Sequence, residues 1–229
     1  AKIKNGKYIA YFQSFTNTYG DIDYLRSIFT EAINHPDIVA LSIGTRPDCL
    51  PDEVLNLLDE LNKIKPVWIE LGLQTIHENT AKYINRGYTL DVFNTAVNNL
   101  NKINVDVIVH LIIGLPFESK EDILESVKYV SSMNISGIKL QLLHVLKNTP
   151  LEKEYSLNKF EVLSMEEYVD IIAECLRYIP RNIVIHRLTG DGPKSILVAP
   201  LWSGNKKAVL NYMNKRFDEL NVIQGSLCS

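Results

Sequence analysis

The sequence has few cysteines, and their positions exclude several kinds of site. Only Cys49, Cys175 and Cys228 occur among 229 residues. Three thiols on widely separated segments argue against a disulfide-stabilised scaffold and fit a protein of the reducing cytoplasm. The same spacing excludes a local cysteine motif, so this chain is predicted to supply no metal ligands of its own.

Long apolar runs are also lacking. No stretch approaches the roughly 20 residues of a membrane helix, and residues 1–4 (AKIK) do not start a signal peptide. The formal net charge is −3, so bulk charge favours neither nucleic acid nor an anionic membrane as partner. No Walker loop and no dinucleotide-binding fingerprint occurs. We therefore expect no membrane association.

Hydrophobic residues make up 46% of the chain, which is enough for a sizeable core. Short β-rich runs alternate with segments of helical period, and the strands recur about every 30 residues, as in βαβ units. Strands are predicted at 8–12, 38–43, 67–71, 105–113, 137–143 and 183–187. Helices are predicted at 21–34, 51–63, 77–85, 89–102, 119–133, 164–178 and 204–220. The sequence predicts an α/β fold.

The strands at 39–43 and 107–113 are nearly unbroken apolar runs, which suit a parallel sheet covered on both faces. Polar residues follow the strands rather than precede them, and in a β/α barrel the chemistry gathers at the carboxyl ends of the strands. Loops are often polar for other reasons. We nevertheless favour a partial (β/α) barrel of parallel strands over a doubly wound sheet.

Three ordered motifs stand at 70–75 (ELGLQT), 84–89 (INRGYT) and 110–116 (HLIIGLP). They resemble the core of the radical S-adenosylmethionine (radical SAM) superfamily, in the branch of the Elongator catalytic subunit and oxygen-independent coproporphyrinogen oxidase. Further strings resemble an uncharacterised bacterial radical SAM family with its own C-terminal domain: 11–19 (YFQSFTNTY), 42–49 (SIGTRPDC), 186–190 (HRLTG) and 200–202 (PLW).

The resemblance implies a domain organisation. Residues 1–150 would be the barrel core from its second strand onward, and residues 151–229 a C-terminal radical SAM-associated region with a small α/β extension. The superfamily carries a three-cysteine CxxxCxxC-type loop after the first barrel strand, which this sequence does not contain. Either a cluster-binding segment lies upstream of Ala1, or the chain is a cluster-free homologue. We favour the upstream segment, because the matching pocket residues would otherwise have little to do.

The resemblance also assigns residues to the SAM pocket. Arg86 matches the arginine that pairs with the methionyl carboxylate, which a planar guanidinium can bind through two parallel hydrogen bonds. Gln74 matches a residue that binds the ribose hydroxyls, and His110 stands near the same ribose. The remaining pocket positions are the turn Gly114 and Pro116 beside adenine, the amine-binding loop residues Ser14, Thr16 and Asn17, and Glu70 of the matched segment.

Each assignment has a structural alternative. Arg86 can instead cap a helix C-terminus before Gly87, His110 can be a core histidine, and Gln74 can be a surface residue. Arg46 and Asp48 form either an ion pair within their loop or a substrate contact. The other substrate-facing candidates are His144, His186 and Arg187. His144 and His186, even with Asp191, lack the spacing of metal ligands.

The implied chemistry uses SAM and a [4Fe–4S] cluster on three thiolates. It would cleave SAM to a 5′-deoxyadenosyl radical, with flavodoxin or ferredoxin as the kind of electron donor. Residues from 181 onward carry seven Lys or Arg against three Asp or Glu, a net of +4. This basic tail and the Elongator-like resemblance suggest tRNA as the substrate class, although a solvated helix at 204–220 explains the same charges.

Two other functions remain open on the sequence. A cluster-free scaffold or binding protein would keep the barrel and lose the chemistry. A conventional barrel lyase or isomerase would use His110, His144 and Glu70 as acid and base.

Overall fold

The computed structural model describes residues 6–190 and 192–228, so Asp191 lies outside the described residues. Six strands form one sheet in the order β1 (Tyr8–Phe12), β2 (Ile38–Thr45), β3 (Val67–Gln74), β4 (Asp106–Ile113), β5 (Gly137–Leu142) and β7 (Val184–Arg187). The pairs β1–β2, β2–β3 and β5–β7 are parallel. The predicted strands are confirmed, and so is the α/β fold with strands in barrel order.

By their contacts, the described residues group into two compact units. The first unit holds residues 6–73, 87–110 and 134–136, and the second holds 74–86, 111–133 and the described residues from 137 onward. This grouping interleaves segments along the chain. The predicted division of the sequence at residue 150 stays a prediction.

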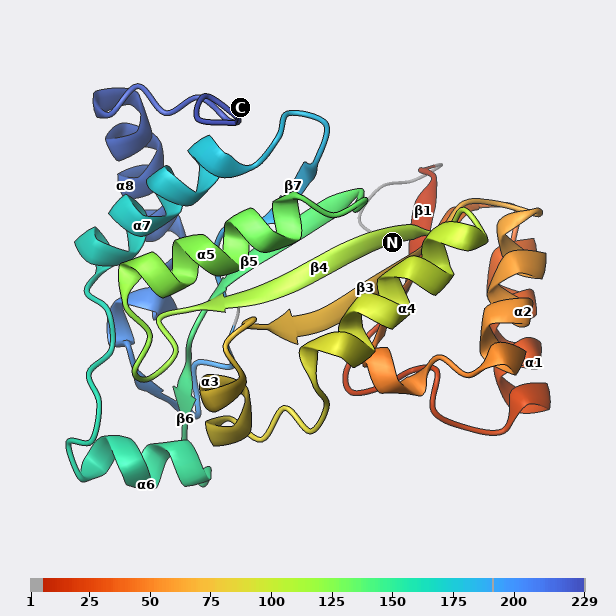
Figure 1. Ribbon diagram of the computed structural model, residues 1–229, viewed down its shortest axis with the longest axis horizontal. Coiled ribbons are helices and arrows are strands. Elements are labelled where there is room, and N and C mark those ends of the chain that lie inside the picture. The colour runs from red at the N-terminus through yellow and green to blue at the C-terminus, as the bar shows by residue number, and fades with distance from the viewer. Residues whose placement is uncertain (1–5, 191, 229) are drawn as a thin grey trace. The chain divides into compact units, whose positions relative to one another are not determined.

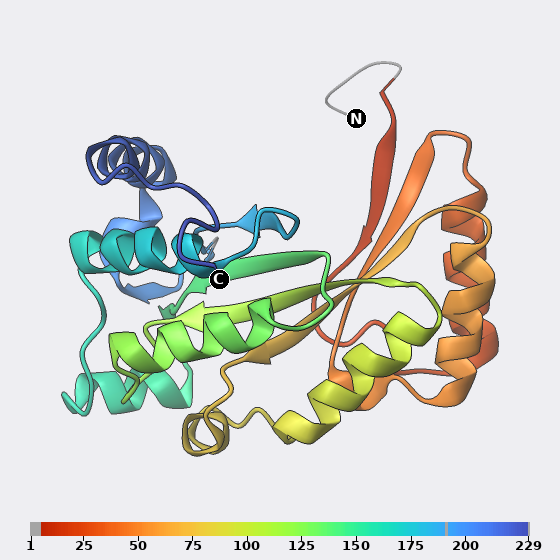
Figure 2. The same ribbon diagram turned by 45° about the horizontal axis from the view of Figure 1, so that its top comes forward.

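The first unit contains α1 (Ile22–Asn34), the short 3-10 turn η1 (Pro47–Cys49), α2 (Asp52–Asn62) and α4 (Leu90–Lys102). Asp21 starts α1 by accepting hydrogen bonds from two backbone N–H groups of the first turn. Leu25, Phe29 and Ile33 are spaced four apart, so they share one helix face, and all three are buried. Figure 2 shows α1 beside α2 and next to β2.

The second unit contains α3 (Glu78–Tyr83), α5 (Lys120–Ser131), α6 (Pro150–Ser156), α7 (Met165–Tyr178) and α8 (Lys206–Glu219). Ser119 and Asp122 form a reciprocal capping box at the start of α5. Ser164 and Glu167 do the same at α7. Figure 1 shows α5 and α7 side by side, where they pack on each other.

The C-terminal elements follow the prediction in part. β7 pairs in parallel with β5, and the predicted helix at 204–220 is α8. α8 contacts α7, and Arg216 holds Asp170 with hydrogen bonds of 2.7 and 3.0 Å. The sequence did not predict α6, the short 3-10 turn η2 (Leu201–Gly204), or the antiparallel pair β6 (Val145–Leu146) and β8 (Leu197–Ala199). Two- or three-residue strands are too short to carry a recognisable period.

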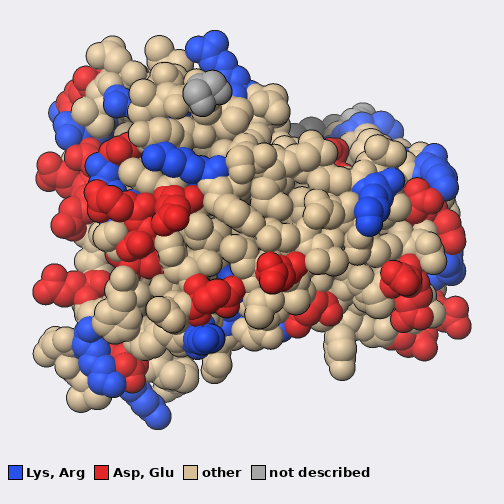
Figure 3. Space-filling view, in the orientation of Figure 1, with Lys and Arg blue, Asp and Glu red and all other residues tan. Residues whose placement is uncertain are grey.

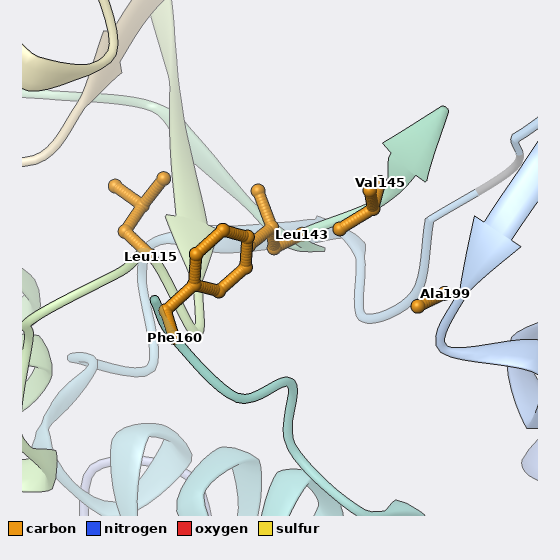
Figure 4. Packing of buried hydrophobic residues seen from close by; sticks show 5 residues of the cluster. All are labelled: Leu115, Leu143, Val145, Phe160 and Ala199. Carbon is orange, nitrogen blue, oxygen red and sulfur yellow. The ribbon is translucent and has the colours of Figure 1, made fainter. Parts of the chain in front are cut away.

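A small apolar cluster supports the turn that follows β4. Figure 4 shows the Phe160 ring beside Leu143 and facing Leu115, with Val145 and Ala199 coming from β6 and β8. Leu115 is 3% exposed and Val145 is fully buried. The cluster therefore anchors the segment that starts at Gly114.

Candidate functional site

The first unit holds a buried carboxylate bonded from three other strands. Glu70 of β3 is 4% exposed. Its Oε2 accepts from the Tyr11 hydroxyl of β1 at 2.7 Å and from Nε2 of His110 of β4 at 3.0 Å. Its Oε1 accepts from Oγ of Ser42 of β2 at 2.9 Å. We call these four residues the Glu70 cluster.

Strand register explains why these side chains meet. Tyr11 lies opposite Ser42, and Gly44 lies opposite Glu70 in the parallel ladders. Side chains two apart on a strand share a face, so Tyr11, Ser42 and Glu70 point to the same side of the sheet. A buried carboxylate is costly unless it accepts several hydrogen bonds, and the cluster provides them. With Glu70 ionised, His110 carries its hydrogen on Nε2.

The Asn17 side chain helps to hold the loop after β1. The Asn17 amide donates to the carbonyl oxygens of Phe12, Ser14 and Gly44, the last at 2.9 Å. Asn17 therefore ties the loop to β2. Among the described residues, the hydroxyls of Ser14 and Thr16 make no hydrogen bond, so they are available to a ligand. Ser14 is exposed and has a positive φ of 74°.

Arg46 and Asp48 form the predicted ion pair within their loop. Nε and Nη2 of Arg46 donate to the two carboxylate oxygens at 2.9 and 2.7 Å, which lowers the pKa of Asp48. The guanidinium lies 5.2 Å from the Tyr88 ring centre. Burial, and then the Asp48 charge, raise the pKa of the neighbouring Cys49, so this thiol is not activated.

In the second unit, Arg86 is buried and bonded. Its side chain is 1% exposed, and it donates to the Thr75 carbonyl at 2.7 Å and to Oε1 of Glu78 at 2.8 Å. Thr75 precedes α3 and Glu78 lies in its first turn, so the guanidinium reaches the helix start. The alternative in which it caps the C-terminus of α3 does not describe these bonds. A buried arginine facing a carboxylate shows that the position accepts an anionic oxygen.

Three further positions of the second unit lie at strand ends. Gln74 ends β3 with a φ of 71°, and its amide makes no hydrogen bond to the described residues. Gly114 follows β4 with a φ of 84°, and a Cβ there would lie 2.9 Å from the Leu163 side chain. This turn therefore requires glycine. Pro116 is buried just beyond it.

The substrate candidates of the second unit occupy different surroundings. His144 is enclosed by backbone: a Cβ on Gly190 would lie 2.5 Å from its ring, and one on Gly192 2.6 Å. His186 is exposed on β7, and Arg187 ends that strand opposite Lys139 of β5. In the part of the chain that the structure describes, His144 and His186 belong to no group of potential metal ligands.

Sequence reasoning gave no role to Tyr11 and Ser42, although both stand in the matched strings. It also missed His77, Asp122 and Glu125, whose ligand atoms lie within 4.8 Å of one another. The signal for this group was Asp122 and Glu125 three apart on α5, but nothing in the sequence brings His77 to them. Exposed acidic groups of this kind are common without a metal.

The comparisons with known proteins agree with the strand order and the motifs. The family model of the radical SAM superfamily matches residues 1–130, and that of the radical SAM C-terminal domain matches residues 135–219. The chain belongs to the radical SAM superfamily. The predicted resemblance is therefore confirmed.

The chain is similar to the uncharacterized protein YtqA of Bacillus subtilis, with 45% identity across 98% of this chain and 70% of YtqA. It is 26% identical to the tRNA uridine(34) acetyltransferase of Methanocaldococcus jannaschii, over 77% of this chain and 33% of that protein. Among solved structures, Elp3 of Methanocaldococcus infernus with residues 1–46 deleted has a TM-score of 0.77 at 21% identity. That match covers 94% of this chain and 55% of the archaeal chain, and it shows a shared fold.

The thiols of this radical SAM chain do not fit an iron–sulfur cluster. Cys175 is fully buried in α7, where burial raises its pKa to about 12. Cys49 is half-buried and Cys228 is exposed on separate segments. Among the described residues, no three thiols lie together. No helix of the described part is both long and apolar enough to cross a membrane.

Proposed function

We propose that this protein is a radical SAM enzyme that acts on RNA. The family match over residues 1–130 and 135–219 carries the proposal. When bound, a reduced [4Fe–4S] cluster would cleave SAM to methionine and a 5′-deoxyadenosyl radical that removes a hydrogen atom from the substrate. The residues of this chain bind and orient SAM and exclude water.

The cluster ligands would come from protein encoded upstream of Ala1, because the three thiols here do not fit the group. The gene sequence preceding Ala1 tests this directly. A CxxxCxxC-like loop there supports the enzyme. Its absence supports the cluster-free scaffold instead.

In the first unit, the loop after β1 offers two hydroxyls that would contact SAM. Ser14 and Thr16 would bind the methionyl amine, while Asn17 holds the loop that presents them. Glu70 would act by orienting His110, which would contact the ribose. Fixing the imidazole through a buried carboxylate is a common way to set the tautomer of a functional histidine.

In the second unit, Gln74 would bind the ribose diol through its amide, which offers both a donor and an acceptor. Gly114 and Pro116 would lie against adenine. Arg86 would bind the methionyl carboxylate, for which Glu78 now stands as the anionic partner. SAM would therefore compete with Glu78 for Nη2 of Arg86.

RNA is proposed as substrate because of the likeness to a tRNA uridine(34) acetyltransferase. The basic C-terminal tail supports RNA binding less well than its net charge suggests, because two of its cations lie next to acidic residues. Arg216 is paired with Asp170, and Lys215 lies 3.7 Å from Glu219. Figure 3 shows lysines and arginines interspersed with acidic residues on one face. We propose a cytoplasmic enzyme supplied with electrons by flavodoxin or ferredoxin.

The test uses the intact protein, reconstituted anaerobically with iron and sulfide. With dithionite and SAM we expect 5′-deoxyadenosine, detected by mass spectrometry, and more of it when RNA is added. No 5′-deoxyadenosine from a fully reconstituted protein would overturn the proposal. If the protein instead converts a substrate without SAM, and the His110→Ala variant does not, the conventional barrel lyase or isomerase would be supported.

A further inference from the structure

An aromatic pair stands exposed beside the turn that follows β4. Phe117 is 69% exposed and Tyr83, the last residue of α3, is 37% exposed. Their ring centres lie 5.1 Å apart at an interplanar angle of 74°. In such an edge-on contact one ring uses only its edge, so ring faces remain for a third partner.

The backbone holds Phe117 outward. Gly114 and Phe117 have φ values of 84° and 67°, and between them Leu115 and Pro116 are buried. Leu115 is anchored in the apolar cluster of Figure 4. A left-handed φ is uncommon and costly for a residue with a Cβ. A fixed turn thus keeps a large apolar ring in solvent, where it gains nothing from burial.

Tyr83 is fixed from the other side. Its hydroxyl donates to Oε2 of Glu154 at 3.3 Å, and Glu154 also binds Nζ of Lys159 at 2.9 Å. The ring that Phe117 contacts is therefore tethered to α6. Lys82, next to Tyr83, is exposed and forms no ion pair with the described residues.

We infer that Phe117 and Tyr83 form a stacking platform for an unpaired base of the substrate RNA. This inference rests on the proposed RNA function. Sequence-tolerant binding of single-stranded RNA uses exposed aromatic faces for the bases and nearby cations for the phosphates. Phe117 supplies an open face, Tyr83 fixes its position, and Lys82 supplies the cation. The adenine of SAM is an aromatic base like those of RNA and would stack on the same ring. The experiment therefore distinguishes RNA from SAM as the ligand of Phe117.

The experiment measures binding of a short, fluorescein-labelled single-stranded RNA to the intact protein by fluorescence anisotropy. Phe117→Leu keeps an apolar side chain and removes the ring, so we expect affinity to fall by about five- to a hundred-fold. Phe117→Trp should restore it. Leu157→Ser, which alters another exposed apolar side chain (68%), is the matched control and should leave affinity unchanged. An RNA with abasic sites should bind wild type and Phe117→Leu equally.

The outcomes separate the two proposals. If wild type binds no RNA, the proposed substrate class fails and the platform with it. If RNA binds and Phe117→Leu binds it as tightly, the platform alone is wrong. If Phe117→Leu weakens SAM binding in calorimetry but not RNA binding, the ring serves adenine and the RNA platform is again overturned.

Discussion

Nε2 of His110 and Oε2 of Glu70 are joined by a 3.0 Å hydrogen bond between two strands of the sheet. The Glu70 carboxylate is 4% exposed, so hydrogen-bond donors of the protein, rather than water, must stabilise a negative charge there. Since Tyr11 and Ser42 also donate to it, the cluster combines a structural role with a group that orients His110.

Glu70→Ala should lower the free energy of unfolding by about 1–3 kcal/mol, because it leaves buried donors without their acceptor. Glu70→Gln, which keeps one acceptor, should cost less. Chemical denaturation monitored by circular dichroism measures both. An alanine variant as stable as wild type would show that the cluster is not a structural element.

Glu118 should make stability depend on pH. Burial raises its pKa above the usual 4.5, while hydrogen bonds from Thr75 and Thr80 oppose the shift. A raised folded-state pKa means that the unfolded chain ionises first, so this group's contribution to stability falls as pH rises above about 4.5. Glu118→Gln removes the ionisation. Its free energy of unfolding should therefore fall less than that of wild type between acidic and neutral pH. Parallel urea titrations test this, and identical pH profiles would contradict it.

The glycines around His144 should resist substitution. Gly190→Ala would place a Cβ 2.5 Å from the imidazole and should cost about 1–3 kcal/mol through overpacking. Gly204→Ala is the matched control, since its Cβ would meet only Leu197 at 3.9 Å. Thermal denaturation should show a lower Tm for the first variant only. Equal Tm values would mean that the ring moves aside freely.

Arg86→Ala in the intact, reconstituted protein should weaken SAM binding about ten- to a hundred-fold, the effect of losing a charged hydrogen-bonding pair. The absorption spectrum of the cluster should not change. Calorimetric titration measures the affinity, and Arg26→Ala, at an exposed arginine paired with Glu60, is the control. This chain alone, without cluster ligands, should bind SAM weakly. Tight binding by the chain alone would show that the pocket assignment is wrong.

Local pattern predicted the six-stranded sheet and its main helices because their apolar residues recur with a clear period. It did not reach β6 and β8, which are only two and three residues long, or α6, which buries none of its residues and so lacks an apolar stripe. Tyr11 was missed as a partner of Glu70, since that contact depends on the register between strands. The Arg86–Glu78 pair was missed because it depends on how the chain turns back around α3. Such contacts follow from tertiary structure, which no single segment encodes.

The first strand of the sheet has a practical consequence. Among the described residues, β1 pairs only with β2, and Ile9 and Tyr11 are 46% and 40% exposed along it. An edge strand presents backbone donors and acceptors to any extended segment that meets it. The upstream barrel strand that we propose for the intact protein would pair along this edge, so edge-to-edge association at high concentration, measured by sedimentation, should occur with this chain alone and not with the intact protein.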